Sequence, residues 1–228
     1  MATRIPEGSS IRVVVEAVDG THAAISSDPE TAALAQTWVG LLGQADAQAK
    51  ARSDADRALT RARSRLSVCD AKWDATVAAF GRAVVDSSGG RRDQPSYTRF
   101  FGKTTPSAAQ TFGVQREIES GRSWLVELGR NASEPLAQTW TPKLKAATDE
   151  LEMAHNQRND CLRALEPLQT AVLLLIDDVN RELNRLEGDL KKIFPSAPDR
   201  VASYLSSTRP SRTSPSDEPV PTPTPAAK

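Results

Sequence analysis

The chain has 228 residues, of which 39% are hydrophobic and only 5% aromatic, and its 29 basic side chains balance 29 acidic ones. A core so poor in aromatic rings suits long helices packed side by side better than a thick globular interior. The balanced charge gives no support for a dedicated nucleic-acid-binding protein, which usually carries a basic excess. Two cysteines are too few for a disulfide scaffold or a zinc cluster.

The sequence shows no segment expected to enter or cross a membrane. The first residues lack the apolar stretch of a secretory signal. The longest unbroken apolar run, Ala171–Ile176, is far shorter than the roughly 20 residues that a membrane-spanning helix needs. We therefore expect a cytoplasmic protein that is not an integral membrane protein, and the frequent Arg and Ala hint at a bacterial source.

Residues 1–28 are expected to form a small N-terminal segment containing a β-hairpin. Ile11–Ala17 is rich in β-branched residues that roughly alternate, and Asp19-Gly20 supplies a two-residue turn. An isolated hairpin is only marginally stable, so it would have to dock on a helix. The alternative is a short helix through Ile11–Ala17.

A long helix is predicted over residues 29–86, which we name helix A. Asp28 can cap its start, and Pro29 suits the first helical position. Candidate core positions, most of them apolar or small, then recur in alternating steps of four and three, which predicts a coiled-coil seam. The seam comprises Leu34, Trp38, Leu41, Ala45, Gln48, Arg52, Ala55, Leu59, Ala62, Leu66, Cys69, Trp73, Thr76, Phe80 and Ala83.

A loop and a shorter helix are predicted next. Ser and Gly residues break the pattern between 87 and 95, and Pro106 opens helix B, residues 106–129. Between them, Tyr97, Phe100 and Phe101 are expected to be buried against a helix end.

Helix C, residues 133–193, carries the second seam. Its positions are Leu136, Trp140, Leu144, Ala147, Leu151, Ala154, Arg158, Cys161, Leu165, Leu168, Val172, Leu175, Val179, Glu182 and Leu186. A short helix is expected over Asp199–Leu205. The remaining residues, 206–228, are rich in Pro, Ser and Thr, which predicts a disordered tail.

Helices A and C contain an internal repeat. The five residues Leu34–Trp38 have the same sequence as Leu136–Trp140. The predicted fold is therefore all-α: an elongated antiparallel hairpin or coiled-coil bundle of two related long helices, with helix B packed on them. We place this helical bundle domain at residues 29–205.

Two sets of arginines are the candidate functional residues. A second match in the repeat pairs Arg52–Leu59 with Arg158–Leu165, so Arg52 and Arg158 are equivalent in it. Both lie on the seams, where a polar residue can determine register; the favoured alternative is that each guanidinium reaches the surface. Arg57, Arg61 and Arg65 form a stripe off the seam that could bind phosphate or an anionic membrane. Internal pairing or plain solvation is the favoured explanation of that stripe.

No residue is assigned a catalytic, cofactor-binding or metal-ligating role. Gly102–Thr105 mimics the end of a phosphate-binding loop, but the earlier glycine of that motif is missing. Glu152 and His155 share a helix face, which most often means a solvated pair. Cys69 and Cys161 lie on the seams and are expected to be inert core thiols.

These patterns favour a non-enzymatic helical scaffold or adaptor that acts through protein–protein interaction. Its partner would be another protein or a second copy of the chain. The alternative is a peripheral binder of an anionic membrane or nucleic acid through the stripe Arg57, Arg61 and Arg65.

Overall fold

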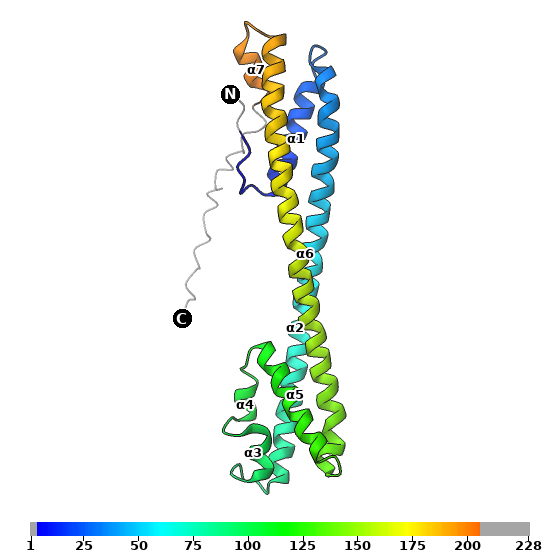
Figure 1. The fold of residues 1–228 in the computed structure, drawn as a ribbon, viewed down its shortest axis with the longest axis vertical. Coiled ribbons are helices and arrows are strands. Elements are labelled where there is room, and N and C mark those ends of the chain that lie inside the picture. Colours follow the sequence, from blue (N-terminus) through cyan, green and yellow to red (C-terminus); the bar gives the residue numbers. More distant parts are fainter. Residues whose placement is uncertain (1–3, 206–228) are drawn as a thin grey trace, which may run out of the picture. The chain divides into compact units, whose positions relative to one another are not determined.

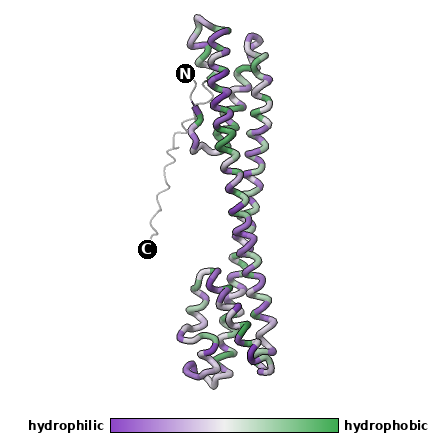
Figure 2. The backbone as a smooth tube through the Cα atoms, viewed as in Figure 1, coloured by the Kyte–Doolittle hydropathy of each residue, from purple (hydrophilic) through white to green (hydrophobic). Residues whose placement is uncertain are grey.

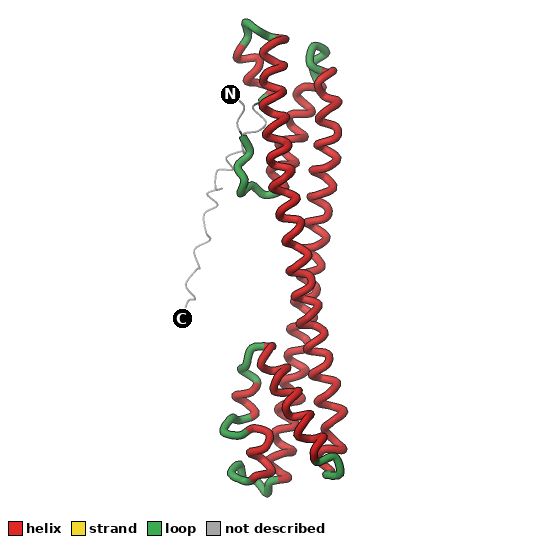
Figure 3. Tube along the Cα trace, in the orientation of Figure 1, coloured by secondary structure: helices red, strands yellow, loops and turns green. Residues whose placement is uncertain are grey.

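The structure, a computed structural model, describes residues 4–205, and in that range it is all-α without a β-strand (Figure 3). This confirms the fold class predicted from the hydrophobic periodicity. The tail predicted at residues 206–228 lies outside the described residues. The elements are α1 (Ile11–Ser26), the 3₁₀ turn η1 (Ala32–Leu34), α2 (Ala35–Ser87), α3 (Pro95–Phe101), α4 (Pro106–Ala109), α5 (Val114–Arg130), α6 (Pro135–Ile193) and α7 (Pro198–Tyr204).

The prediction of an N-terminal β-hairpin is wrong, because Ile11–Ser26 forms the helix α1. Asp19-Gly20, predicted as the turn, lies inside this helix. The physical reason is the spacing of the residues that α1 buries, which recur every three or four positions and form one helical face. They are Val14, Ala17, Val18, Thr21 and Ile25.

The predicted helices A, B and C are present, but they begin and end at other residues than predicted. Helix A begins with the turn η1 and continues as α2, and helix C corresponds to α6. Helix B is two helices, α4 and α5, and the break falls at Gly113, which is the N-cap of α5. Pro142 and Pro167 lie inside α6.

Contacts between residues divide the chain into two compact units. Within the described range, the terminal unit comprises residues 4–50 and 170–205, and the central unit comprises residues 51–169. Each unit therefore contains part of α2 and part of α6. The two units also have separate hydrophobic cores, so each is described by itself.

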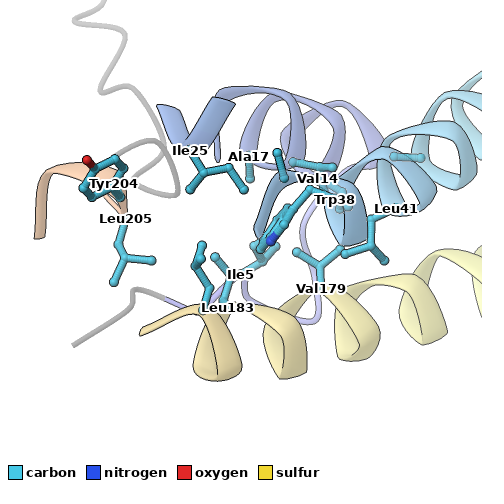
Figure 4. Packing of buried hydrophobic residues seen from close by; sticks show 14 of the residues in the cluster. Ile5, Val14, Ala17, Ile25, Trp38, Leu41, Val179, Leu183, Tyr204 and Leu205 are labelled. Carbon is cyan, nitrogen blue, oxygen red and sulfur yellow. The ribbon is translucent and has the colours of Figure 1, made fainter. Parts of the chain in front are cut away.

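The core of the terminal unit lies between α1, the first part of α2 and the last part of α6 (Figure 1). Trp38 is 2% exposed and lies at its centre, where Val14, Ile5 and Val179 approach it (Figure 4). The short helix α7 packs on the same core. Its Tyr204 stacks on Phe194 with ring centroids 5.9 Å apart.

The core of the central unit is built from aromatic rings of α2, α3, α5 and α6. Trp73 stacks on Trp124 at 5.9 Å between ring centroids, and Phe80 meets Phe100 edge-on at 5.2 Å. The expected burial of Tyr97, Phe100 and Phe101 is confirmed, and all three belong to α3. These rings place α3 and α5 against the long helices.

The parts of α2 and α6 in the central unit run antiparallel. Lys72 pairs with Glu150 at 3.2 Å, and Arg65 donates to Gln157 at 3.1 Å, so numbering rises along one helix as it falls along the other. All positions of both predicted seams are buried or half-buried. Hydrophobic residues accordingly alternate with hydrophilic ones along both helices (Figure 2).

Candidate functional site

The central unit has an open surface groove, which we name the α5 groove, at the first turn of α5. Its volume is ≈ 660 Å³, and α2 and α6 supply its other walls. More of its surface is apolar than polar, and two arginines and a histidine lie along it. The lining residues are Leu66, Gly113, Val114, Gln115, Arg116, Glu119, His155 and Arg158.

Arg116 is held on one side of the groove by an aromatic ring. Its guanidinium carbon lies 3.8 Å from the centroid of Phe112, the residue four positions earlier. Such stacking holds a guanidinium in place while leaving its N–H groups free to donate. Among residues 4–205, Arg116 has no carboxylate partner, so its charge is not neutralised within the described chain.

Arg158 and His155 are linked on the α6 side of the groove. Arg158 donates to Asn159 Oδ1 at 3.2 Å, and Asn159 Nδ2 lies 3.0 Å from His155 Nε2. With Nε2 as the acceptor, the ring proton is on Nδ1, which is buried without a partner in the described part of the chain. Arg158 has an amide and no carboxylate as its partner there.

The electrostatics of the α5 groove favour an anion. The groove is lined by two guanidinium groups and one carboxylate. That carboxylate, Glu119, already accepts a hydrogen bond from Gln115 Nε2 at 3.0 Å. The groove also includes the N-terminal turn of α5, where Gly113 provides no side chain to accept from the free backbone N–H groups. The helix dipole adds partial positive charge at this end.

Arg52 and Arg158, the predicted polar seam pair, both lie in the central unit and are half-buried. Arg52 forms an ion pair with Asp56 at 3.0 Å on its own helix, whereas Arg158 lines the α5 groove. Their environments therefore differ, although the predicted repeat would make their positions equivalent. A role for either in determining register stays a prediction.

The predicted stripe Arg57, Arg61 and Arg65 is exposed on α2. Arg65 donates to Gln157 and lies 3.8 Å from the sulfur of Met153. Within the described range, neither Arg57 nor Arg61 has a carboxylate partner. The stripe is therefore open to solvent, and anion binding by it stays a prediction.

A buried carboxyl group lies on the opposite side of α5 from the groove's exposed residues. Glu117 is 2% exposed, and one of its oxygens has no hydrogen-bond partner among the described residues. Burial, and then hydrogen bonding to Asp70 and the charges of Asp70 and Asp74, raise the pKa of Glu117 to about 8. Burial also raises the pKa of Asp74.

The phosphate-loop-like segment Gly102–Thr105 and the residues Glu152 and His155 take part in local contacts of the fold. Gly102 has a φ of 55° after α3, and Thr105 Oγ1 accepts from the N–H of Ala108 at the start of α4. Glu152 pairs with Arg122, whereas His155 contacts Asn159. Cys69 is buried and Cys161 half-buried, and both are free thiols. Over residues 4–205, no group of three or more His, Cys, Asp or Glu side chains is arranged to hold a metal ion.

The sequence analysis did not single out Arg116 or Glu117, and it considered His155 only as a partner of Glu152. The contact between Phe112 and Arg116 could not be predicted from helical spacing, because Phe112 precedes Gly113, the N-cap of α5, and lies outside the helix. Nothing in the sequence showed that the first turn of α5 would face His155 and Arg158, because the groove depends on how α5 packs against α6.

None of the helices within residues 4–205 has both the length and the apolar character that crossing a bilayer requires. A comparison of the chain with protein-family models, with curated proteins and with solved structures found no match in any of the three.

Proposed function

We propose that the protein is a non-enzymatic helical adaptor that holds a partner protein in the α5 groove. The observation that supports this most is the groove's combination of apolar lining and unneutralised arginines. An open groove between helices suits an extended or helical segment of another protein, which can place apolar side chains inside and polar ones at the rim. The groove is lined by apolar side chains, an amide, two guanidiniums, one carboxylate and one imidazole, a set that suits binding of a polypeptide segment.

The architecture around the groove suits a rigid binding surface. The three walls come from separate helices, and ring contacts of Phe80 of α2 with Trp124 of α5 and Trp140 of α6 pack these helices together. Arg122 of α5 additionally pairs with Asp149 of α6 at 2.7 Å. A surface held in this way loses little conformational entropy when a partner binds, which raises affinity.

The test is affinity capture from the native cells with the full chain and with the double variant Arg116→Glu/Arg158→Glu. A captured protein is then purified and mixed with each bait. The proposal expects a stoichiometric complex with the wild-type chain and a loss of about tenfold or more in affinity with the double variant. Recovery of the bait alone, or equal binding by both baits, would contradict it.

A second candidate is a peripheral binder of an anionic surface, and the exposure of Arg57 and Arg61 without carboxylate partners in the described chain favours it. Binding of this kind weakens strongly as salt is added. The measurement is binding to phosphatidylserine vesicles and to a DNA duplex at low and high salt. Salt-sensitive binding lost in Arg57→Glu/Arg61→Glu would support this candidate, and the absence of binding at low salt would remove it.

A further inference from the structure

We infer that the partner of the α5 groove is an acidic peptide segment that also carries an apolar side chain. The inference rests on the proposed adaptor function and names the chemistry of what the adaptor holds. It follows from charge complementarity and from the arrangement of the groove's apolar and cationic residues.

The cationic side of the groove is formed by Arg116 and Arg158, one from α5 and one from α6. Planar guanidinium groups bind carboxylates through two parallel hydrogen bonds, more strongly than neutral donors do. Arg116 keeps its N–H groups free by stacking on Phe112, and Arg158 uses one nitrogen on the neutral oxygen of Asn159. A segment with two acidic residues can therefore engage both guanidiniums.

Two other arginines of the central unit, Arg122 of α5 and Arg99 of α3, show how the chain itself neutralises a guanidinium. Arg122 lies between two carboxylates, Asp149 and Glu152, and Arg99 is paired with Glu134. These arginines are occupied by the chain itself. Arg116 and Arg158 differ because the described chain supplies neither with a carboxylate, so an acidic partner would complete them as Asp149 and Glu152 complete Arg122.

The apolar requirement comes from the groove's lining. Leu66 of α2 and Val114 of α5 are both half-buried and both line the groove. An apolar side chain placed against them would remove further apolar surface from water, at about 25 cal/mol per Å². A peptide can supply carboxylates and an apolar group together, whereas a uniform polyanion such as a nucleic-acid backbone presents charge without the apolar contact.

The carboxylate of Glu119 limits which acidic segments fit. Its bond from Gln115 holds it on the exposed side of the first turns of α5. Like charges side by side repel, so the acidic residues of the partner must lie toward Arg116 and Arg158, and its neutral or amide residues toward Glu119. The inference therefore predicts spaced acidic residues rather than a continuous acidic run.

The test is selection of a random 12-residue peptide library, displayed on phage, on the immobilised full chain. We expect enriched peptides that contain two or more Asp or Glu residues and at least one large apolar residue. The affinity of a synthetic copy is measured by fluorescence anisotropy. It should fall about tenfold or more in Arg116→Gln/Arg158→Gln, which removes both charges and leaves shorter, neutral polar side chains, and should weaken as salt is added.

The matched control is Arg57→Gln/Arg61→Gln, which removes the same charge from exposed positions of α2 outside the groove. Its affinity should stay within about twofold of the wild type. Circular dichroism and urea unfolding of each variant show whether a loss of binding reflects a loss of fold. If substitution of the half-buried Arg158 destabilises the protein, the single variant Arg116→Gln, at an exposed position, gives a second measurement of binding.

The failures of the two proposals are distinguishable. Enriched peptides that bind in the groove but lack acidic residues would overturn the acidic-partner inference and leave the adaptor function standing. No enrichment, or peptides insensitive to both groove arginines, would overturn the groove as a binding site. Binding of a DNA duplex or phosphatidylserine vesicles through Arg116 and Arg158, in place of peptides, would also overturn the inference.

Discussion

Ile5 and Asn180 exchange two hydrogen bonds although 175 positions separate them in the chain. The backbone N–H of Ile5 donates to Asn180 Oδ1 at 2.8 Å, and Asn180 Nδ2 donates to the carbonyl of Ile5 at 2.9 Å. One side-chain amide of α6 thus satisfies both backbone groups of a residue outside any helix. This contact holds Ile5 in the core of the terminal unit, where it is 2% exposed.

We predict that Asn180→Ala loosens this N-terminal attachment. The variant removes both hydrogen bonds and leaves partly buried backbone groups without partners, so the free energy of unfolding should fall by about 1–3 kcal/mol. The backbone amide of Ile5 should exchange with deuterium much faster. Asn156→Ala, at an exposed position of α6, is the control; unchanged protection of Ile5 in Asn180→Ala would contradict the role given to this contact.

Gly121 allows α5 to approach α6 closely. A Cβ at this position would lie 2.4 Å from Thr148 Oγ1, whereas a Cβ at Gly129, on the same helix, would meet nothing within 4 Å. Gly121→Ala should therefore lower the free energy of unfolding by about 1–3 kcal/mol through overpacking. Gly129→Ala should leave it equal or raise it by up to about 1 kcal/mol.

The clash at Gly121 can be tested by a compensating change. Adding Thr148→Ala removes the hydroxyl and methyl groups that the new Cβ would meet, so the double variant should regain stability relative to Gly121→Ala. Urea unfolding gives the free energy of unfolding of the wild type, Gly121→Ala, Thr148→Ala and the double variant. If the double variant is less stable than Gly121→Ala by the full effect of Thr148→Ala alone, the two sites are independent and the proposed contact is wrong.

Glu117 should make stability depend on pH. Its folded-state pKa of about 8 lies above the ordinary value of 4.5, so the folded state binds the proton more tightly than the unfolded chain does. Its contribution to stability is full below the unfolded pKa and is lost as the pH rises through the folded pKa. Glu117→Gln should therefore flatten the fall in unfolding free energy between about pH 5 and about pH 8. The exposed neighbour Glu119→Gln should keep the wild-type profile; a Glu117→Gln profile identical to wild type would exclude this role.

Asp28 should make the stability of the terminal unit depend on pH in the opposite direction. Its carboxylate accepts from the Tyr204 hydroxyl, from the backbone N–H of Glu30 and from Arg200, which together lower its pKa from 3.8 to about 2. The stabilisation by Asp28 is present above the pKa of this group in the unfolded chain and is lost as the pH falls through its pKa in the folded protein. Asp28→Asn should be less stable than wild type near neutral pH, with the difference shrinking in acid. Exposed Asp19→Asn is the control, and a difference that persists unchanged to about pH 2 would contradict the assignment.

The long helices could be predicted because their burial is periodic. Trp73, Val77 and Phe80 of α2 are fully buried at steps of four and three residues, and a helix that long makes such a pattern hard to mistake. The N-terminal error has the opposite cause. Over Ile11–Ala17 alone, β-branched residues favour a strand, and the helical spacing is visible only when Ile25 is included, since burial of that longer face outweighs local β-propensity.

The candidate site could not be predicted from the sequence, because it depends on tertiary packing. Arg116 and Arg158 are far apart in the chain and have no shared motif, and only the crossing of α5 and α6 brings both to one groove. Glu117 looked like an ordinary helical glutamate, because its burial follows from packing of α5 on the face of α2 that carries Asp70 and Asp74. The arginines on the seam and the stripe were identified by their own spacing, which requires only one helix.

The measurement that tests the adaptor account most directly is photo-crosslinking from inside the α5 groove. A photoreactive residue replaces Gln115, which is exposed and lines the groove, and in a control chain it replaces Val39, which is 50% exposed in the terminal unit. After irradiation in the native cells, mass spectrometry identifies the crosslinked segment. The account predicts an adduct from position 115 with an acidic segment of another protein, and no such adduct from position 39. Equal adducts from both positions, or none with another protein from position 115, would contradict it.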